Sequence, residues 1–127
     1  MERIYDMVII GGGPGGYTAA LYGARAGLDV VVLERLSAGG QMALTAQIDN
    51  YPGFEEGIDG FTLGMKMQQG AERFGARTEL AEVRAVKLEG SIKEVATCGS
   101  SCTNVYCVSS CSFMSILPSC ASIRPRK

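Results

Sequence analysis

The sequence contains no histidine and no run of about 18 apolar residues, the length that a transmembrane helix needs. Because histidine is the commonest general base near neutral pH, acid/base chemistry would need another residue type or a cofactor. The net charge of −1 and the pI near 5.4 argue against a nucleic acid or an anionic membrane as partner. The first apolar run, residues 7–10, is too short for the core of a signal peptide. We therefore expect a cytoplasmic protein.

Acidic residues and cysteines are missing from opposite ends of the chain. All 13 acidic residues lie at or before Glu94. All five cysteines lie after it, at Cys98, Cys102, Cys107, Cys111 and Cys120. The 127 residues suffice for one ordinary domain. This change in composition predicts a domain over residues 1–95 and a poorly ordered, Cys/Ser-rich tail over residues 96–127, of the kind produced when unrelated coding sequence follows a frameshift.

The cysteine spacing within the tail defines a competing hypothesis for function. Three residues separate Cys98 from Cys102, and three separate Cys107 from Cys111. This spacing matches neither the redox Cys-x-x-Cys motif nor a standard zinc pairing, so we assign no metal ligand. Binding of a soft metal by the tail stays open as an alternative.

A glycine-rich turn between a strand and a helix is the most informative motif. Residues 5–10 form an apolar run typical of a buried strand, and residues 14–26 carry the small and apolar spacing of a helix. Between them stands Gly11-x-Gly13-x-x-Gly16, the fingerprint of dinucleotide-binding folds. Gly11 permits the tight turn, Gly13 lets a pyrophosphate approach the backbone, and Gly16 lets the helix lie close to the strand. Pro14 suits the first helical turn, where its missing N–H costs nothing.

A second strand and a carboxylate complete the fingerprint. Residues 30–33 are a β-branched run, and Glu34 follows them, 23 residues after Gly11. A carboxylate about 20 residues after the first glycine accepts hydrogen bonds from an adenosine ribose and disfavours a 2′-phosphate. The phosphates would lie at the N-terminus of the helix, where free N–H groups and the helix dipole favour anions. A βαβ unit without a ligand is the alternative.

The middle of the chain predicts a long loop followed by further α/β elements. Residues 37–60 are rich in glycine and contain Gly39-Gly40-Gln41 and a turn at residues 49–53. A loop of this length is usually functional, although a surface Ω-loop without a ligand is the alternative. Residues 60–74 have helical spacing, and residues 80–88 suggest one or two strands. We expect an α/β, Rossmann-like FAD/NAD(P)-binding domain with a parallel sheet. The family resemblance described next implies that this domain is incomplete in this chain.

Three segments resemble one known family. They are residues 5–20 (YDMVIIGGGPGGYTAA), residues 38–42 (AGGQM) and residues 49–53 (DNYPG). Together they are similar to the N-terminal FAD-binding segment of bacterial low-molecular-weight thioredoxin reductases, over about residues 4–95. The resemblance implies FAD as cofactor. The implied FAD contacts are Gly11, Gly13, Pro14, Gly15, Gly16, Glu34, Arg35, Gly39, Gly40, Gln41, Thr45, Asn50 and Val83.

The resemblance also implies where each part of FAD would lie. The adenosine would contact Glu34 and Arg35, and the strand that contains Val83 would cover the adenine. The pyrophosphate would lie at residues 13–16. The ribityl and flavin end would lie near residues 40, 41, 45 and 50.

The activity of that family needs parts that do not occur in this sequence. Such reductases pass electrons from NADPH through FAD to a protein disulfide such as that of thioredoxin, typically as homodimers. They use a second FAD-contacting segment, an NADPH domain with its own glycine fingerprint, and a Cys-x-x-Cys pair. Here Val95-Ala96-Thr97-Cys98 only echoes that pair, because Val95 stands in the first cysteine's place. We therefore expect an FAD-binding fragment without a catalytic residue, inactive alone, with a non-catalytic adenine-dinucleotide-binding module as the alternative.

Overall fold

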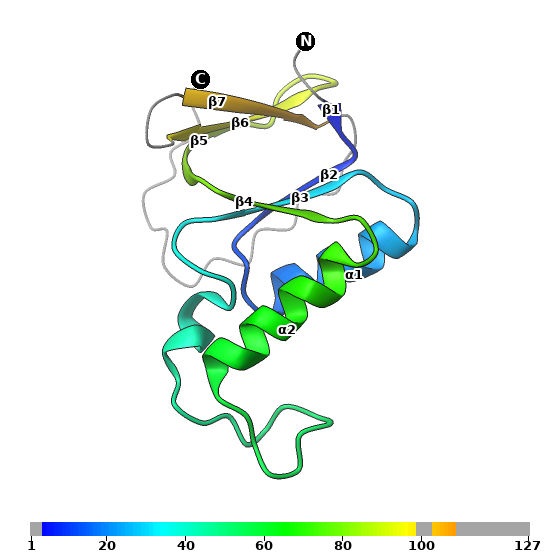
Figure 1. Ribbon diagram of the computed structural model, residues 1–127. Helices are drawn as coiled ribbons and strands as arrows, with labels where there is room; N and C mark the ends of the chain where they lie inside the picture. Colours follow the sequence, from blue (N-terminus) through cyan, green and yellow to red (C-terminus); the bar gives the residue numbers. More distant parts are fainter. Residues whose placement is uncertain (1–3, 99–102, 109–127) are drawn as a thin grey trace.

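The structure is a computed structural model that describes residues 4–98 and 103–108. Its elements follow one another in the order shown in Figure 1. They are β1 (Ile4–Tyr5), β2 (Met7–Ile10), α1 (Pro14–Arg25), β3 (Val30–Glu34), the 3₁₀ helix η1 (Gly40–Leu44), α2 (Gly60–Glu72), β4 (Arg77–Leu80), β5 (Glu82–Lys87), β6 (Lys93–Cys98) and β7 (Thr103–Val108).

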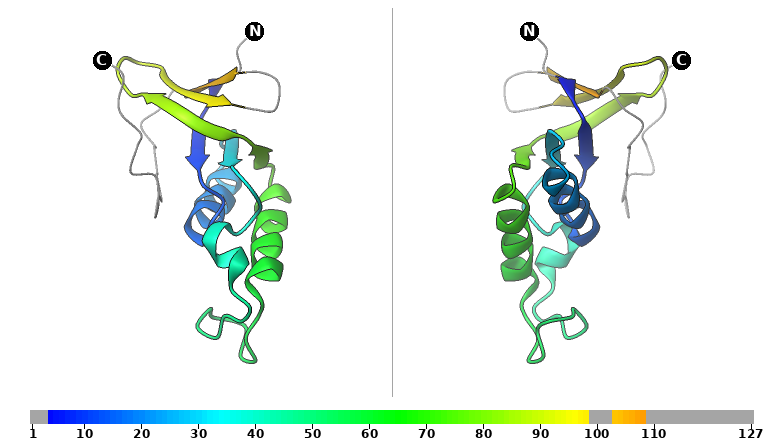
Figure 2. Two further views of the ribbon diagram at one scale, coloured as in Figure 1. Left: turned by 90° about the vertical axis from the view of Figure 1, so that its left-hand side faces the viewer. Right: turned by 90° about the vertical axis from the view of Figure 1, so that its right-hand side faces the viewer.

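Two sheets and a pair of helices form three layers. Strands β2, β3 and β4 make a parallel sheet in that order, and β1, β7, β6 and β5 make a second sheet in which β5, β6 and β7 are antiparallel. Both helices cover one face of the parallel sheet, and the second sheet covers its other face (Figures 1 and 2). The predicted α/β, Rossmann-like class is confirmed.

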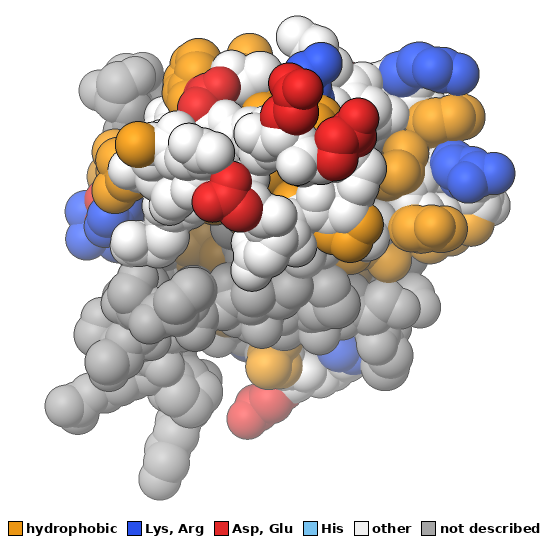
Figure 3. Space-filling model, turned by 90° about the horizontal axis from the view of Figure 1, so that it is seen from below, with side chains coloured by type: hydrophobic (Ala, Val, Ile, Leu, Met, Phe, Trp, Pro, Cys, Tyr) orange, Lys and Arg blue, Asp and Glu red, His pale blue; other side chains and the backbone are white. Residues whose placement is uncertain are grey.

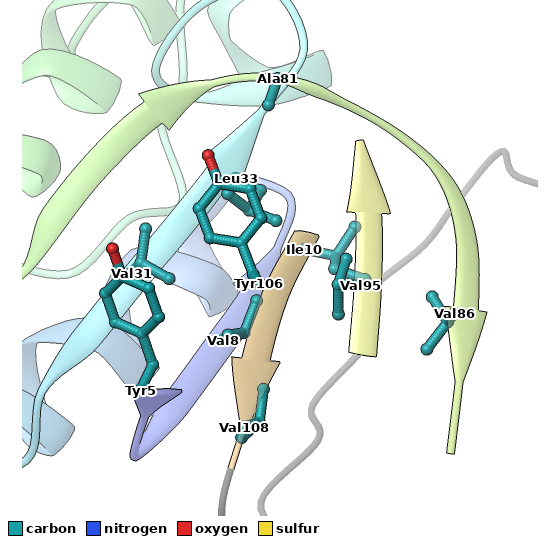
Figure 4. Packing of buried hydrophobic residues seen from close by; sticks show 10 residues of the cluster. All are labelled: Tyr5, Val8, Ile10, Val31, Leu33, Ala81, Val86, Val95, Tyr106 and Val108. Carbon is teal, nitrogen blue, oxygen red and sulfur yellow. The ribbon is translucent and has the colours of Figure 1, made fainter. Parts of the chain in front are cut away.

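The alternation of side chains along β3 explains why the parallel sheet is buried on both faces. Val31 and Leu33 join the cluster between the two sheets, whereas Val30 and Val32 join the cluster beneath the helices. All four are at most 1% exposed. Figure 4 shows the first cluster, with Leu33 beside the ring of Tyr106 and Val31 beside the ring of Tyr5. A strand buried on both faces reads as a continuous apolar run, which is the pattern seen in the sequence.

Helix α1 lies close to the sheet because its inner face is made of small residues. Ala20 and Ala24 are buried, and a Cβ on Gly23 would stand 3.1 Å from Val30 Cγ2. The helix ends where Gly27 N–H donates to Ala24 O at 3.0 Å and Leu28 N–H donates to Gly23 O at 3.1 Å. This pair of bonds is a Schellman motif, with Gly27 just past the helix end at φ 84°.

The predicted strand over residues 5–10 is broken at Asp6. The N–H groups of Asp6 and Met7 both donate to Asp29 O, at 3.0 and 3.2 Å, and the Asp6 carboxylate accepts from Asp29 N–H at 2.9 Å. These bonds turn the chain, so that β1 pairs with β7 while β2 pairs with β3. One apolar run therefore serves two sheets.

Ordered structure also extends past the expected domain boundary. Residue 95 lies inside β6, and residues 103–108, expected in the poorly ordered tail, form β7. Tyr106 is 6% exposed, its ring lies 6.0 Å from that of Tyr5, and its hydroxyl donates to Glu79. Three successive residues of this strand, 106–108, are buried, and the Ser and Cys content around them hides this in the sequence. The remaining tail positions, 99–102 and 109–127, lie outside the described residues.

Changing Tyr106 tests this extension of the core. Tyr106→Ala should lower the free energy of unfolding by about 3–5 kcal/mol, because it removes a buried ring between the two sheets. Val105→Ala, on the same strand but 40% exposed, should cost less than about 1 kcal/mol. Urea denaturation measures both values. Equal, small effects would contradict the packing of β7 against the core.

Candidate functional site

The glycine turn brings the start of α1 directly against the end of β2. Gly11 N–H donates to Leu33 O at 2.8 Å, which places the turn beside the end of β3. A Cβ on Gly16 would stand 2.1 Å from Gly11 O, so only glycine allows this approach. The first intrahelical bond then runs from Tyr17 N–H to Gly13 O at 3.0 Å.

The first N–H groups of α1 are available to a ligand. Gly13 is the N-cap and has no side-chain capping bond. Within residues 4–98 and 103–108, none of the hydrogen bonds found uses the N–H groups of Gly13, Gly15 or Gly16. A Cβ on Gly13 would meet nothing within 4 Å, so the space beside this residue is open. Free donors at the positive end of a helix of 12 residues favour an anion.

Glu34 places a carboxylate beside this turn. The residue is 7% exposed at the end of β3. Its Oε2 accepts from Gly12 N–H at 2.6 Å, and its Oε1 accepts from Arg35 N–H at 2.8 Å and Leu36 N–H at 3.2 Å. An ionised carboxylate offers about four acceptor positions. Three are engaged, which leaves capacity on Oε2 for a ligand hydroxyl.

A buried tyrosine lies behind the carboxylate. Tyr17 of α1 is 1% exposed, and its hydroxyl lies 3.4 Å from Thr78 Oγ1 of β4. Burial raises the pKa of the Tyr17 hydroxyl, and the negative charge of Glu34 raises it further, although the bond to Thr78 lowers it. Tyr17 therefore stays neutral at physiological pH. It closes the inner side of the turn to water.

The loop after β3 is fixed against the same turn. Gly39 N–H donates to Gly12 O at 2.7 Å, and a Cβ on Gly40 would lie 3.7 Å from Gly13 Cα. Helix α2 holds the loop from the other side, because a Cβ on Gly64 would stand 2.6 Å from Ala38 O. The loop backbone is therefore held between the glycine turn and α2.

A groove continues from the start of α1 along the loop. Its volume is about 530 Å³. The lining residues are Pro14, Met42, Thr45, Gln47, Ile48, Asp49, Asn50 and Tyr51. The bridge between Ile48 and Ile58, with N···O distances of 2.8 and 3.0 Å, shapes the outer part of the loop.

The loop end of the molecule is acidic. The view from below in Figure 3 shows acidic side chains over this end, with Lys and Arg toward the margins. The exposed acidic residues of the loop are Asp49, Glu55, Glu56 and Asp59. Hydrogen bonding from Thr62 lowers the pKa of Asp59, which is the N-cap of α2. Anionic groups are therefore favoured at the glycine turn and not along the outer loop.

The structure brings most of the predicted cofactor residues together. Residues 11–16, Glu34, Gly39 and Gly40 meet at the turn, and Pro14, Thr45 and Asn50 line one groove. Arg35 and Gln41 are exposed, and Gln41 is not among the residues that line the groove. Val83 packs against the cluster between the sheets, two residues after Ala81, whose N–H donates to Glu34 O at 2.9 Å.

Two features of the site were missed in the sequence. Gly12 is the variable position of the fingerprint, yet its N–H donates to Glu34 Oε2 and its carbonyl accepts from Gly39 N–H. Gly60 and Gly64 were not assigned to the site, although both press on the loop backbone. The four-residue spacing of these two glycines, on one helix face, was the available signal.

Known proteins with similar sequences and structures point to the same kind of site. A family model described as pyridine nucleotide-disulphide oxidoreductase matches residues 5–106. The chain belongs to the pyridine nucleotide-disulphide oxidoreductase family. The match runs past residue 95 into β7, which agrees with the finding that β7 is part of the second sheet.

The relatives that match this family member are thioredoxin reductases. The bifunctional thioredoxin reductase/thioredoxin of Mycobacterium leprae is 48% identical over 96 residues, which are 76% of this chain and 21% of that protein. The thioredoxin reductase of Mycolicibacterium smegmatis is 47% identical over 94 residues, 74% of this chain and 30% of that protein. The predicted resemblance is confirmed. The chain spans less than a third of the length of these two relatives.

A solved structure supports the same assignment. The thioredoxin reductase from Gloeobacter violaceus has a TM-score of 0.78 and 34% identity, and the match covers 87% of this chain and 33% of that one. FAD is the cofactor of these family members, as the resemblance implied. No helix among the described residues is long and apolar enough to cross a membrane. The described part of the chain also holds no group of three or more metal-ligating side chains.

Gly16→Ala should be strongly destabilising. Its Cβ would overlap Gly11 O, so the helix and strand must separate, at a cost of about 3 kcal/mol or more. Gly13→Ala is the matched control, because its Cβ enters open space and should cost less than about 1 kcal/mol. Thermal and urea denaturation compare the two. A Gly16→Ala variant as stable as Gly13→Ala would contradict the close approach.

Proposed function

We propose that this chain binds FAD through the ADP half of the cofactor, as the FAD-binding part of a thioredoxin-reductase-like flavoprotein. The observation that carries the proposal is the open N-terminus of α1 beside Glu34. It joins free N–H donors for phosphates to a buried carboxylate for a ribose hydroxyl. FAD would supply the chemistry that these side chains lack, which is transfer of electrons through its flavin ring.

The proposal includes a direction for the cofactor. The pyrophosphate would lie on the N–H groups of Gly13, Gly15 and Gly16, where the missing Cβ of Gly13 leaves room for it. The adenosine would then lie toward Glu34 and Arg35, with Val83 of β5 contributed by the second sheet. The ribityl and flavin end would follow the groove past Gly40 and Gln41 toward Thr45 and Asn50.

We extend the proposal to a complete protein that would contain an FAD-binding segment of this kind. In the relatives named above, the activity is thioredoxin reduction, so the substrate proposed for a complete protein is a thioredoxin-like disulfide. A cytoplasmic location belongs to the same proposal, because the thioredoxin system keeps cytosolic thiols reduced. So does a homodimer, which the family resemblance implies. Metal binding by the tail cysteines is the second candidate; three of those cysteines lie outside the described residues.

Binding of FAD is the direct test. The purified chain should acquire flavin absorbance on incubation with FAD, and ADP should compete for the site. Gly13→Ala should weaken FAD binding at least tenfold with little loss of stability, because the added methyl occupies the path of the pyrophosphate. Gly70→Ala is the control, since its Cβ also meets nothing within 4 Å but lies on α2 away from the turn.

The competing functions give different results in the same experiment. A chain that binds NADH but not FAD would overturn the FAD assignment and favour a nicotinamide-nucleotide module. Zinc retained after dialysis, and lost when Cys98 and Cys102 are changed together, would favour the metal-binding tail.

A second prediction concerns activity. This chain should not oxidise NADPH in the presence of thioredoxin and excess FAD, because its sequence has one glycine fingerprint and no Cys-x-x-Cys. Absorbance at the NADPH band measures the rate. Turnover of roughly 1 to 10³ per second that disappears in Gly13→Val would show the prediction to be wrong. Loss of that turnover in Cys98→Ser would then identify Cys98 as part of a displaced redox centre.

A further inference from the structure

The side chain of Glu34 binds the backbone of the glycine turn, in addition to its proposed contact with the ribose. Glu34 is 7% exposed, and its carboxylate joins two segments that are far apart in sequence. One oxygen accepts from Gly12 N–H at 2.6 Å, and the other accepts from Arg35 and Leu36 N–H. The same side chain therefore ties the β2–α1 turn to the start of the loop that lines the groove.

The turn depends on a small number of such bonds. Residues 11–13 are three consecutive glycines, which have the largest backbone freedom of any residue type. Apart from the bond from Tyr17 N–H to Gly13 O that starts the helix, the hydrogen bonds of these residues run from Gly11 N–H to Leu33 O, from Gly12 N–H to Glu34, and from Gly39 N–H to Gly12 O. Glu34 supplies the only side-chain partner among these three. It acts next to Gly13, the first residue of the turn whose N–H has no hydrogen-bond partner among the described residues.

We propose that Glu34 is a positioning residue for the pyrophosphate, in addition to its contact with the ribose. This inference rests on the proposed function. By holding Gly12 N–H, the carboxylate sets the direction of the N–H groups of Gly13 and Gly15 before a ligand arrives. Donors fixed in advance bind an anion more tightly than donors that must be ordered on binding.

The effect of neutralising Glu34 on pyrophosphate affinity separates this positioning role from a purely electrostatic one. Glu34 is a negative charge near an anion site, so if it acted by charge alone, its neutralisation would strengthen pyrophosphate binding. If it acts by positioning, neutralisation must weaken that binding. Glu34→Gln puts an amide NH₂ where one oxygen accepted, so at least one of the three backbone bonds is lost. Glu34→Asp keeps the charge and withdraws it by one methylene.

The experiment titrates inorganic pyrophosphate and adenosine separately into the ¹⁵N-labelled chain, with ADP as the reference ligand. We expect Glu34→Gln and Glu34→Asp to bind pyrophosphate at least threefold more weakly than wild type. The amide of Gly12 should also exchange faster with solvent. Val86→Ala, which removes volume from the cluster between the sheets, should lower the melting temperature and leave pyrophosphate affinity unchanged. This control separates positioning from a general loss of stability.

Four outcomes would overturn the inference. If both variants lose affinity for adenosine only, or if Glu34→Gln binds pyrophosphate more tightly, Glu34 acts on the ribose or by charge, and the proposed function stands. If wild type binds ADP but pyrophosphate shifts none of the turn amides, the inference also fails alone. If wild type binds neither ADP nor FAD, the proposed function and the inference fail together. Should Glu34→Gln not fold, the charge-conserving Glu34→Asp variant decides.

Discussion

The close contact between Gly16 and the carbonyl of Gly11 is the constraint on which the rest of the site depends. It lets α1 begin immediately at the end of β2, so that the first N–H groups of the helix open beside the end of β3. A separated helix would carry the same donors but would not place them next to Glu34. The phosphate position and the ribose position are therefore fixed by one backbone contact.

The three-layer arrangement supports that contact from both sides. The small residues of α1 press the helix onto β2 and β3, while the second sheet buries the opposite face of the same strands. Helix α2 then holds the loop over residues 38–44 against the turn through Gly60 and Gly64. The groove exists because the loop is held at its start and left to bulge outward between residues 45 and 58.

Much of this could be predicted from the sequence, because the relevant signals are local. The strand–turn–helix order, the role of Gly16, the helix end at Gly27 and the position of Glu34 all follow from spacing within about 25 residues. Features that depend on long-range pairing could not be predicted. The break at Asp6 requires Asp29, and the inclusion of residues 103–108 requires the edge that β1 and β6 offer to β7. The bond between Glu34 and Gly12 N–H could not be predicted either, because the fingerprint leaves the position of Gly12 variable.

The central claim is that an ADP moiety binds with its phosphates at the start of α1 and its ribose at Glu34. Chemical-shift mapping with ADP on the ¹⁵N-labelled chain tests it most directly. The account predicts that the largest shifts fall on the amides of Gly13, Gly15 and Gly16, followed by Gly12 and Arg35, with little change in β6 and β7. Shifts confined to β5–β7 or to the outer loop at residues 49–57, with the glycine turn unaffected, would contradict it.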